Sequence, residues 1–167
     1  MKQLLLINPE NVSETEVKTY PVREAARAIV LDNENKIALM HVSNKNYYKL
    51  PGGGIEAAED RMLALQRECL EEIGCEVEVL SEVGSIVEYR KIFGIKQISY
   101  CYLAKVKGTK GKVAFTDEEI AAGFEQVWVS YSEALQLMKE SNATDTEGRD
   151  YIVPRDTTLL DAVKDLI

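Results

Sequence analysis

The residues best suited to chemistry lie between Gly53 and Cys75, in the segment GGIEAAEDRMLALQRECLEEIGC. On a helix, residues three and four apart share a face, so Glu68, Glu71 and Glu72 would project together from one turn. Three carboxylates this close raise one another's pKa values unless a positive charge compensates them. A hard divalent cation would compensate them, because Mg²⁺ takes oxygen ligands and keeps positions for water and substrate phosphates.

Arg67 stands four residues before Glu71 and supplies one compensating charge. The opposite side of the segment is apolar at helical spacing, which predicts an amphipathic helix from about Asp60 to Ile73 that packs on a core. The apolar positions are Met62, Leu65, Cys69, Leu70 and Ile73. Gly74 follows them, where a left-handed glycine commonly ends a helix.

The segment has the register G-x5-E-x7-R-E-U-x-E-E-x-G-U, with U an apolar residue, and so resembles the signature motif of the Nudix (MutT-like) hydrolases. Both U positions are cysteine, Cys69 and Cys75, and a free thiol packs as a small hydrophobe. The motif is preceded by PGGG, a loop that can bring bare backbone close to a ligand. An isolated acidic helix face would more simply be a solvated surface.

The resemblance implies an α/β fold, a Nudix-like α/β/α sandwich around a mixed β-sheet. It also implies a Mg²⁺- or Mn²⁺-dependent pyrophosphohydrolase, which cleaves the diphosphate of a nucleoside diphosphate linked to another moiety. The metal ligands it implies are Glu68, Glu71, Glu72 and the backbone carbonyl near Gly52 or Gly53, with Glu68 also counted as catalytic. Arg67 and Glu59 would form an ion pair that joins the loop to the helix. The family usually has glycine before that glutamate, and a positive φ at Ala58 would cost about 1 kcal/mol.

Hydrolysis of a diphosphate needs charge neutralisation and an aligned water more than covalent chemistry. In the family the base that activates water comes from the motif or from a later loop. The later loop here, TDEEIAAGFEQVW, offers Glu118, Glu119 and Glu125. We favour Glu119, and the alternative is an acidic surface loop.

Arg27 interrupts an apolar strand, and an arginine that faces a sheet interior requires an anionic partner. The alternative is an edge residue whose charged end reaches solvent. Tyr47, Tyr48 and Lys49 flank the glycine loop and could stack on a base or contact phosphate, although such tyrosines more often pack in a core. The predicted substrate-binding residues are Arg27, Tyr48, Lys49, Gly53 and Gly54.

The 167 residues are expected to form one domain, 1–167, with a net charge of −8. This charge disfavours a nucleic-acid partner but not a small anionic substrate that carries metal. No membrane span or secretory signal is expected, and the three cysteines, without metal spacing, indicate reduced thiols in a cytoplasm. A homodimer is left open. With one histidine, His41, the chain cannot build a histidine-rich zinc site.

The rest of the chain predicts strands and helices in mixed order. Strands are expected at 23–32, 36–42, 76–90, 95–108 and 126–130, with a hairpin connection at 91–94. Ser130 and Glu133 form a predicted capping box before a helix at 133–140. A polar loop over 143–150 precedes a final helix capped by Asp156. The inward residues of that helix are predicted to be Leu159, Leu160, Val163 and Leu166.

Two other functions compete with hydrolysis. One is a Nudix-like module that senses a nucleotide or metabolite without turnover, which the fold alone would not distinguish from an enzyme. Non-catalytic relatives typically lose motif carboxylates, and this motif is intact. The other is a prenyl diphosphate isomerase, which the single histidine fits poorly. The sequence does not identify the substrate.

Overall fold

A computed structural model describes residues 1–167, which fold around one eight-stranded sheet. The strands are β1 (Gln3–Ile7), β2 (Val22–Leu31), β3 (Ile37–Val42), β4 (Tyr47–Lys49), β5 (Gly52–Gly54), β6 (Glu76–Arg90), β7 (Ile95–Lys107) and β8 (Phe124–Val129). The helices are α1 (Glu14–Val17), α2 (Arg61–Ile73), α3 (Asp117–Ala121), α4 (Tyr131–Glu140) and α5 (Val153–Asp161). Short 3₁₀ turns occur at Ser43–Lys45 and Lys91–Phe93, and a π-helical turn at Gly148–Ile152.

The sheet is mixed, in the order β1-β6-β7-β2-β3-β4, with β5 also paired to β2 and β8 to β3. Strand β2 runs parallel to β7, and β1 runs parallel to β6, whereas the other pairs are antiparallel. Alternate residues of a strand face opposite sides. Ala28 of β2 therefore packs in a core with Leu65 of α2, while Ile29 packs in a second core with Met138 of α4 and Leu159 of α5.

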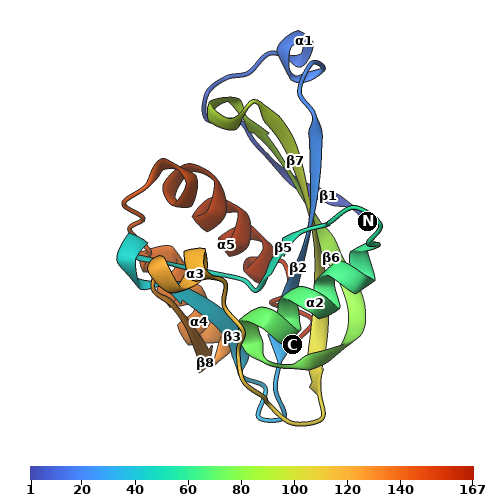
Figure 1. Ribbon diagram of the computed structural model, residues 1–167, viewed down its shortest axis with the longest axis vertical. Coiled ribbons are helices and arrows are strands. Elements are labelled where there is room, and N and C mark those ends of the chain that lie inside the picture. The colour runs from blue at the N-terminus through green and yellow to red at the C-terminus, as the bar shows by residue number, and fades with distance from the viewer.

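Helices α2 and α5 consequently lie on opposite sides of the sheet (Figure 1). This arrangement is the predicted α/β/α sandwich around a mixed sheet. The predicted strands are present with end shifts of one or two residues, and 76–90 is reproduced without a shift. The short strands β4 and β5, on either side of Leu50 and Pro51, were not predicted.

Local end signals account for the position of α2. The Asp60 side chain accepts hydrogen bonds from the backbone N–H groups of Met62 (2.8 Å) and Leu63 (2.9 Å), as an N-cap residue does. Gly74 ends the helix with φ of +63°. Ser130 likewise caps α4 and accepts from the N–H of Glu133 at 3.3 Å.

The predicted start of the last helix was wrong. Helix α5 begins at Val153, so Asp156 lies inside it, fully buried, and does not cap its end. The predicted loop 143–150 enters the π-helical turn at Gly148. Leu166 is 57% exposed because the helix ends at Asp161, five residues earlier. The other predicted inward residues, Leu159, Leu160 and Val163, are buried.

The three cysteines are buried and unpaired. None of the helices has the length and apolar character needed to cross a membrane.

Ala58 adopts a positive φ, +73°, at the position where the family usually has glycine. We expect Ala58→Gly to raise the free energy of unfolding by about 0.5–1 kcal/mol. The left-handed conformation costs a residue with a Cβ about 1–2 kcal/mol, and glycine avoids this cost. Glycine's greater freedom in the unfolded chain offsets about 0.4–1 kcal/mol of the gain. Denaturant unfolding measures the change. Ala57→Gly is the matched control, because Ala57 is not among the residues with positive φ, and it should not stabilise. A loss of stability in Ala58→Gly would contradict the argument.

Candidate active site

A cavity of about 380 Å³ opens between β2, the glycine strand β5 and helix α2, and only four of its 20 lining residues are hydrophobic. Its size and polarity suit a small charged ligand. Helix α2 contributes Glu68 and Glu72, and β2 contributes Arg23 and Arg27. The two walls of the cavity thus have opposite charge.

Glu68 and Glu72 lie four residues apart on α2, and both are buried. Glu72 is only 1% exposed, and it accepts hydrogen bonds from Lys49 Nζ (2.7 Å) and from the N–H of Gly52 (2.6 Å). Burial raises the pKa of Glu72, while the charge of Lys49 acts in the opposite direction. Lys49, predicted to bind substrate, is therefore held by a buried ion pair.

Glu71 does not join them at the cavity. Its side chain is 41% exposed and contacts Arg67 at 3.1 Å. Glu71 and Glu72 are consecutive, and consecutive residues of a helix point about 100° apart. The structure therefore brings two of the three predicted glutamate ligands, and not Glu71, to the cavity.

Arg67 joins the loop to the helix as predicted. Its guanidinium bonds both oxygens of Glu59, at 2.8 and 3.0 Å, and reaches Glu68 at 2.7 Å and the carbonyl of Gly54 at 2.9 Å. These hydrogen bonds from Arg67 are the main reason that the pKa of Glu59 falls to about 2. Arg67 thereby fixes one oxygen of Glu68 relative to the glycine strand.

The glycines of β5 are required by space. A Cβ on Gly53 would lie 2.2 Å from Glu68 Oε1, and one on Gly54 would lie 2.8 Å from a guanidinium nitrogen of Arg23. Gly52 has φ of +130° and packs directly on the backbone of β2. Its carbonyl, predicted as a metal ligand, accepts a buried hydrogen bond from Arg27. Charged side chains of both walls thus pack directly against bare backbone.

Tyr48, predicted as a substrate contact, does not line the cavity. Side chains alternate along β4, so Tyr47 and Lys49 face the cavity and Tyr48 faces away. Tyr48 instead stacks on His41 of β3, with ring centroids 4.4 Å apart. Because β4 itself was not predicted, the alternation could not be applied to these residues.

Arg27 is 6% exposed, and no carboxylate lies within 4.0 Å of it. Its Nε has no hydrogen-bond partner. Burial, followed by the charge of Arg155, lowers the pKa of Arg27 to about 10. A buried guanidinium without an ion pair is costly, and an anionic ligand in the cavity would supply the missing charge.

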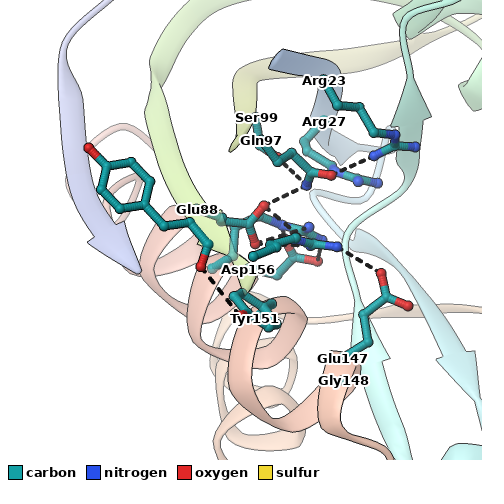
Figure 2. A network of polar contacts seen from close by, with 12 residues as sticks. Arg23, Arg27, Glu88, Gln97, Ser99, Glu147, Gly148, Tyr151 and Asp156 are labelled. Atoms are coloured by element: carbon teal, nitrogen blue, oxygen red, sulfur yellow. Dashed lines mark hydrogen bonds and ion pairs between the residues drawn. The ribbon is translucent and has the colours of Figure 1, made fainter. Parts of the chain in front are cut away.

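Four further cationic residues on this wall were missed by sequence reasoning: Arg23, Lys45, Arg90 and Arg155. They come from separate parts of the chain and belong in part to the polar network of Figure 2, in which Arg90 donates to Glu88 and Arg155 to Asp156. One local signal existed for Arg23. It precedes Arg27 by four residues on one strand, and residues at even spacing share a face.

The loop before β8 brings two of its three glutamates to the cavity. Glu118 and Glu119 line it, whereas Glu125 lies on β8 and contacts His41 at 3.4 Å. Glu119 Oε2 accepts from the N–H of Thr116 (2.8 Å) and from its hydroxyl (3.0 Å), and so closes a capping box on α3. The Oε1 of Glu119 remains unengaged.

No three acidic, histidine or cysteine side chains are clustered so as to form a metal centre by themselves. Glu68 and Glu72 nevertheless line the cavity, and the Glu68 carboxylate lies beside the backbone of Gly53. Mg²⁺ commonly binds through one or two carboxylates and completes its shell with water and substrate phosphates. The donor set fits such a cation, which would compete with Lys49 for Glu72.

Comparison with known proteins places this arrangement in a family. A family model described as NUDIX domain matches residues 21–150, which is most of the chain. The chain belongs to the Nudix domain family. It is 29% identical to the methanol dehydrogenase activator of Bacillus methanolicus over 140 residues, which cover 81% of this chain and 72% of that protein.

A second relative of the Nudix chain is the RNA pyrophosphohydrolase of Pelagibacter ubique, 32% identical over 72 residues. That match covers 41% of this chain and spans about half of the relative, 46% of its length. The Nudix hydrolase from Nitrosomonas europaea has the same fold, with a TM-score of 0.64 at 14% identity over 88% of this chain and 96% of that one. The family model and the RNA pyrophosphohydrolase relative support the prediction of a pyrophosphohydrolase, and the solved structure supports the fold.

Proposed function

We propose that this protein is a Mg²⁺-dependent pyrophosphohydrolase, with Mn²⁺ as an alternative cation. The proposed substrate is a nucleoside diphosphate linked to another moiety. The observation that carries the proposal is the cavity that Glu68 and Glu72 share with the buried, unpaired Arg27. The cavity thus combines carboxylates, which suit a cation, with a guanidinium, which suits phosphate.

In this mechanism Arg27 binds the diphosphate and neutralises part of its charge. Glu68 and Glu72 would hold the cation, which when bound would polarise the phosphoryl group and offset negative charge. The contacts of Arg67 with Glu59 and Glu68 keep the acidic wall in place. Positioning and electrostatics of this kind provide most of the catalysis in phosphoryl transfer.

Glu119 is the proposed base. The bonds from Thr116 to Glu119 Oε2 fix the carboxylate at the cavity and leave Oε1 to accept a proton from water. We expect Glu119→Gln to lower kcat about 100-fold or more, which is the usual contribution of a general base. Glutamine can still close the capping box, so the melting temperature should be retained.

Glu118→Gln is the matched variant, with the same charge change one residue away at the same cavity. It should lower kcat about tenfold at most. Steady-state kinetics of both variants decide between the residues. A larger loss in Glu118→Gln would transfer the role to Glu118, and full activity in both would return it to the glutamates of α2.

The proposed function is tested by incubating the purified protein with Mg²⁺ and a panel of nucleotide sugars, dinucleotides and nucleoside triphosphates. Product analysis by chromatography and ³¹P NMR should show hydrolysis of one phosphoanhydride bond. Excess chelator should abolish turnover, and added Mg²⁺ or Mn²⁺ should restore it. Undiminished turnover in chelator would refute the metal-dependent mechanism.

The second candidate is a module that binds a nucleotide derivative without turnover. The observation in its favour is the buried pair of Lys49 with Glu72, which occupies an oxygen that the hydrolytic mechanism requires. One relative is itself named as an activator of another enzyme. Tight binding of a panel member with no product, in Mg²⁺ and in Mn²⁺, would favour this candidate.

A further inference from the structure

A second cavity, of about 220 Å³, adjoins the candidate active site. Four residues line both cavities: Arg23, Arg90, Gln97 and Glu147. The second cavity adds only Phe93 and Ile95, which lie at the end of the long β6–β7 hairpin. A ligand that fills the first cavity can therefore extend past the arginines toward the hairpin.

The two arginines shared by the cavities differ in their charge balance. Arg90 is paired with Glu88 at 3.1 Å and with Glu147 at 2.8 Å. Arg23 has no carboxylate within 4.0 Å, and its one hydrogen bond to a side chain goes to Gln97 Oε1 at 2.5 Å. Partial burial and the nearby charge of Arg90 lower the pKa of Arg23. Arg23 therefore lies at the junction of the cavities without an ion pair.

Arg23 is exposed as a whole residue, and one hydrogen bond, to Gln97, orients its guanidinium. Gln97 is fully buried, and its amide nitrogen donates to Glu88 Oε2 at 2.5 Å and to Ser99 Oγ at 3.3 Å, which directs its oxygen toward Arg23. Figure 2 shows Gln97 between Arg23 and Glu88. A guanidinium that is already oriented loses less entropy when it binds an oxyanion than a free one does.

We propose that this second cavity binds a phosphate monoester carried by the substrate, away from the diphosphate that is cleaved. Arg27 serves the diphosphate, and Arg23, the other arginine of the site without an ion pair, serves the additional phosphate. Phe93 and Ile95 provide an apolar wall for the carbon skeleton that bears it. A phosphate monoester, with close to two negative charges and three acceptor oxygens, suits an unpaired guanidinium. The proposal rests on the proposed function and specifies its substrate class.

Matched ligands that differ by one phosphate test the proposal: coenzyme A against 3′-dephospho-coenzyme A, and NADPH against NADH. Calorimetric titration of the metal-free wild-type protein gives the dissociation constants without requiring turnover. The phosphorylated member of at least one pair should bind about tenfold more tightly or better, as expected for hydrogen bonds to a charged group. A ratio below about twofold for both pairs would overturn the proposal.

Arg23→Gln should reduce that affinity ratio to about twofold or less, and Arg23→Lys should retain part of it. Lys91→Gln is the control, because Lys91 is an exposed cation near the hairpin end that lines neither cavity, and its ratio should equal that of the wild type. An unchanged ratio in Arg23→Gln, with an unchanged melting temperature, would refute the role of Arg23. If the protein prefers the phosphorylated ligands but hydrolyses no panel substrate, only the proposed function is refuted. If it hydrolyses a panel substrate but shows no preference for the phosphorylated ligands, only this subsite is refuted.

Discussion

Glu68→Gln is expected to lower kcat about 100-fold or more, with little change in stability. Glu68 lines the cavity, is buried, and has one oxygen fixed by Arg67 at 2.7 Å. Glutamine keeps the shape of the side chain and an oxygen for that hydrogen bond, but it removes the charge that the mechanism needs. Losing one preorganised electrostatic group commonly reduces kcat by two to three orders of magnitude. The measurement is kcat at saturating Mg²⁺ on the best substrate of the panel.

Glu71→Gln is a closely matched control. Glu71 lies on the same helix, also accepts from Arg67, and loses the same charge on substitution, but it does not line the cavity. Its kcat should change by about threefold or less, as expected for a screened surface charge. Equal losses in the two variants would restore Glu71 as a ligand. Glu72→Gln is a poorer probe, because it also breaks the buried pair with Lys49.

Asp156→Asn is expected to lower the free energy of unfolding by about 3 kcal/mol, because breaking a buried ion pair leaves a charge uncompensated. Asp156 accepts from Arg155 Nε at 2.6 Å and from the N–H of Leu50 at 2.9 Å, and all of these groups are buried. After the substitution, Arg155 retains only Glu88, at 3.7 Å. Denaturant unfolding at neutral pH measures the loss.

The chain contains its own control, because Arg149–Asp150 is a second Arg–Asp pair of adjacent residues, at 2.8 Å on the surface. Asp150→Asn should cost less than about 1 kcal/mol. Similar losses from both substitutions would contradict the role assigned to burial.

Acid should narrow the difference between the wild type and Asp156→Asn. Burial opposes ionisation of Asp156, but the charge and hydrogen bonds of Arg155 outweigh it and lower the pKa below the usual 3.8. The ionised form therefore stabilises the wild type above the usual pKa, and this contribution is lost as the pH falls below 3.8. Unfolding curves at descending pH measure it, and a difference that widens in acid would contradict the assignment.

Features with local causes could be predicted from the sequence. The ends of α2 depend on Asp60 and Gly74, each of which acts within a few residues of itself. The ion pair of Glu59 with Arg67 was implied by the resemblance of the motif to the Nudix signature. Arg27 was recognisable because a charge within an apolar run is unusual.

Features that depend on distant segments could not be predicted in this way. Arg90 and Arg155 reach the cavity from β6 and α5, and nothing near either residue indicates that destination. Asp156 was mistaken for a cap because the apolar repeat begins after it, although Pro154, in the first turn of α5, was the better signal of the start.

The pairing of β2 with β7 has a consequence for how activity is acquired during folding. Residues 22–31 pair with residues 96–105, so the ladder joins segments about 74 residues apart and must close a long loop first. Such non-local pairing slows folding. Because β2 bears the basic wall and also aligns the glycine strand, recovery of hydrolysis during refolding should coincide with the final cooperative step and show no earlier phase.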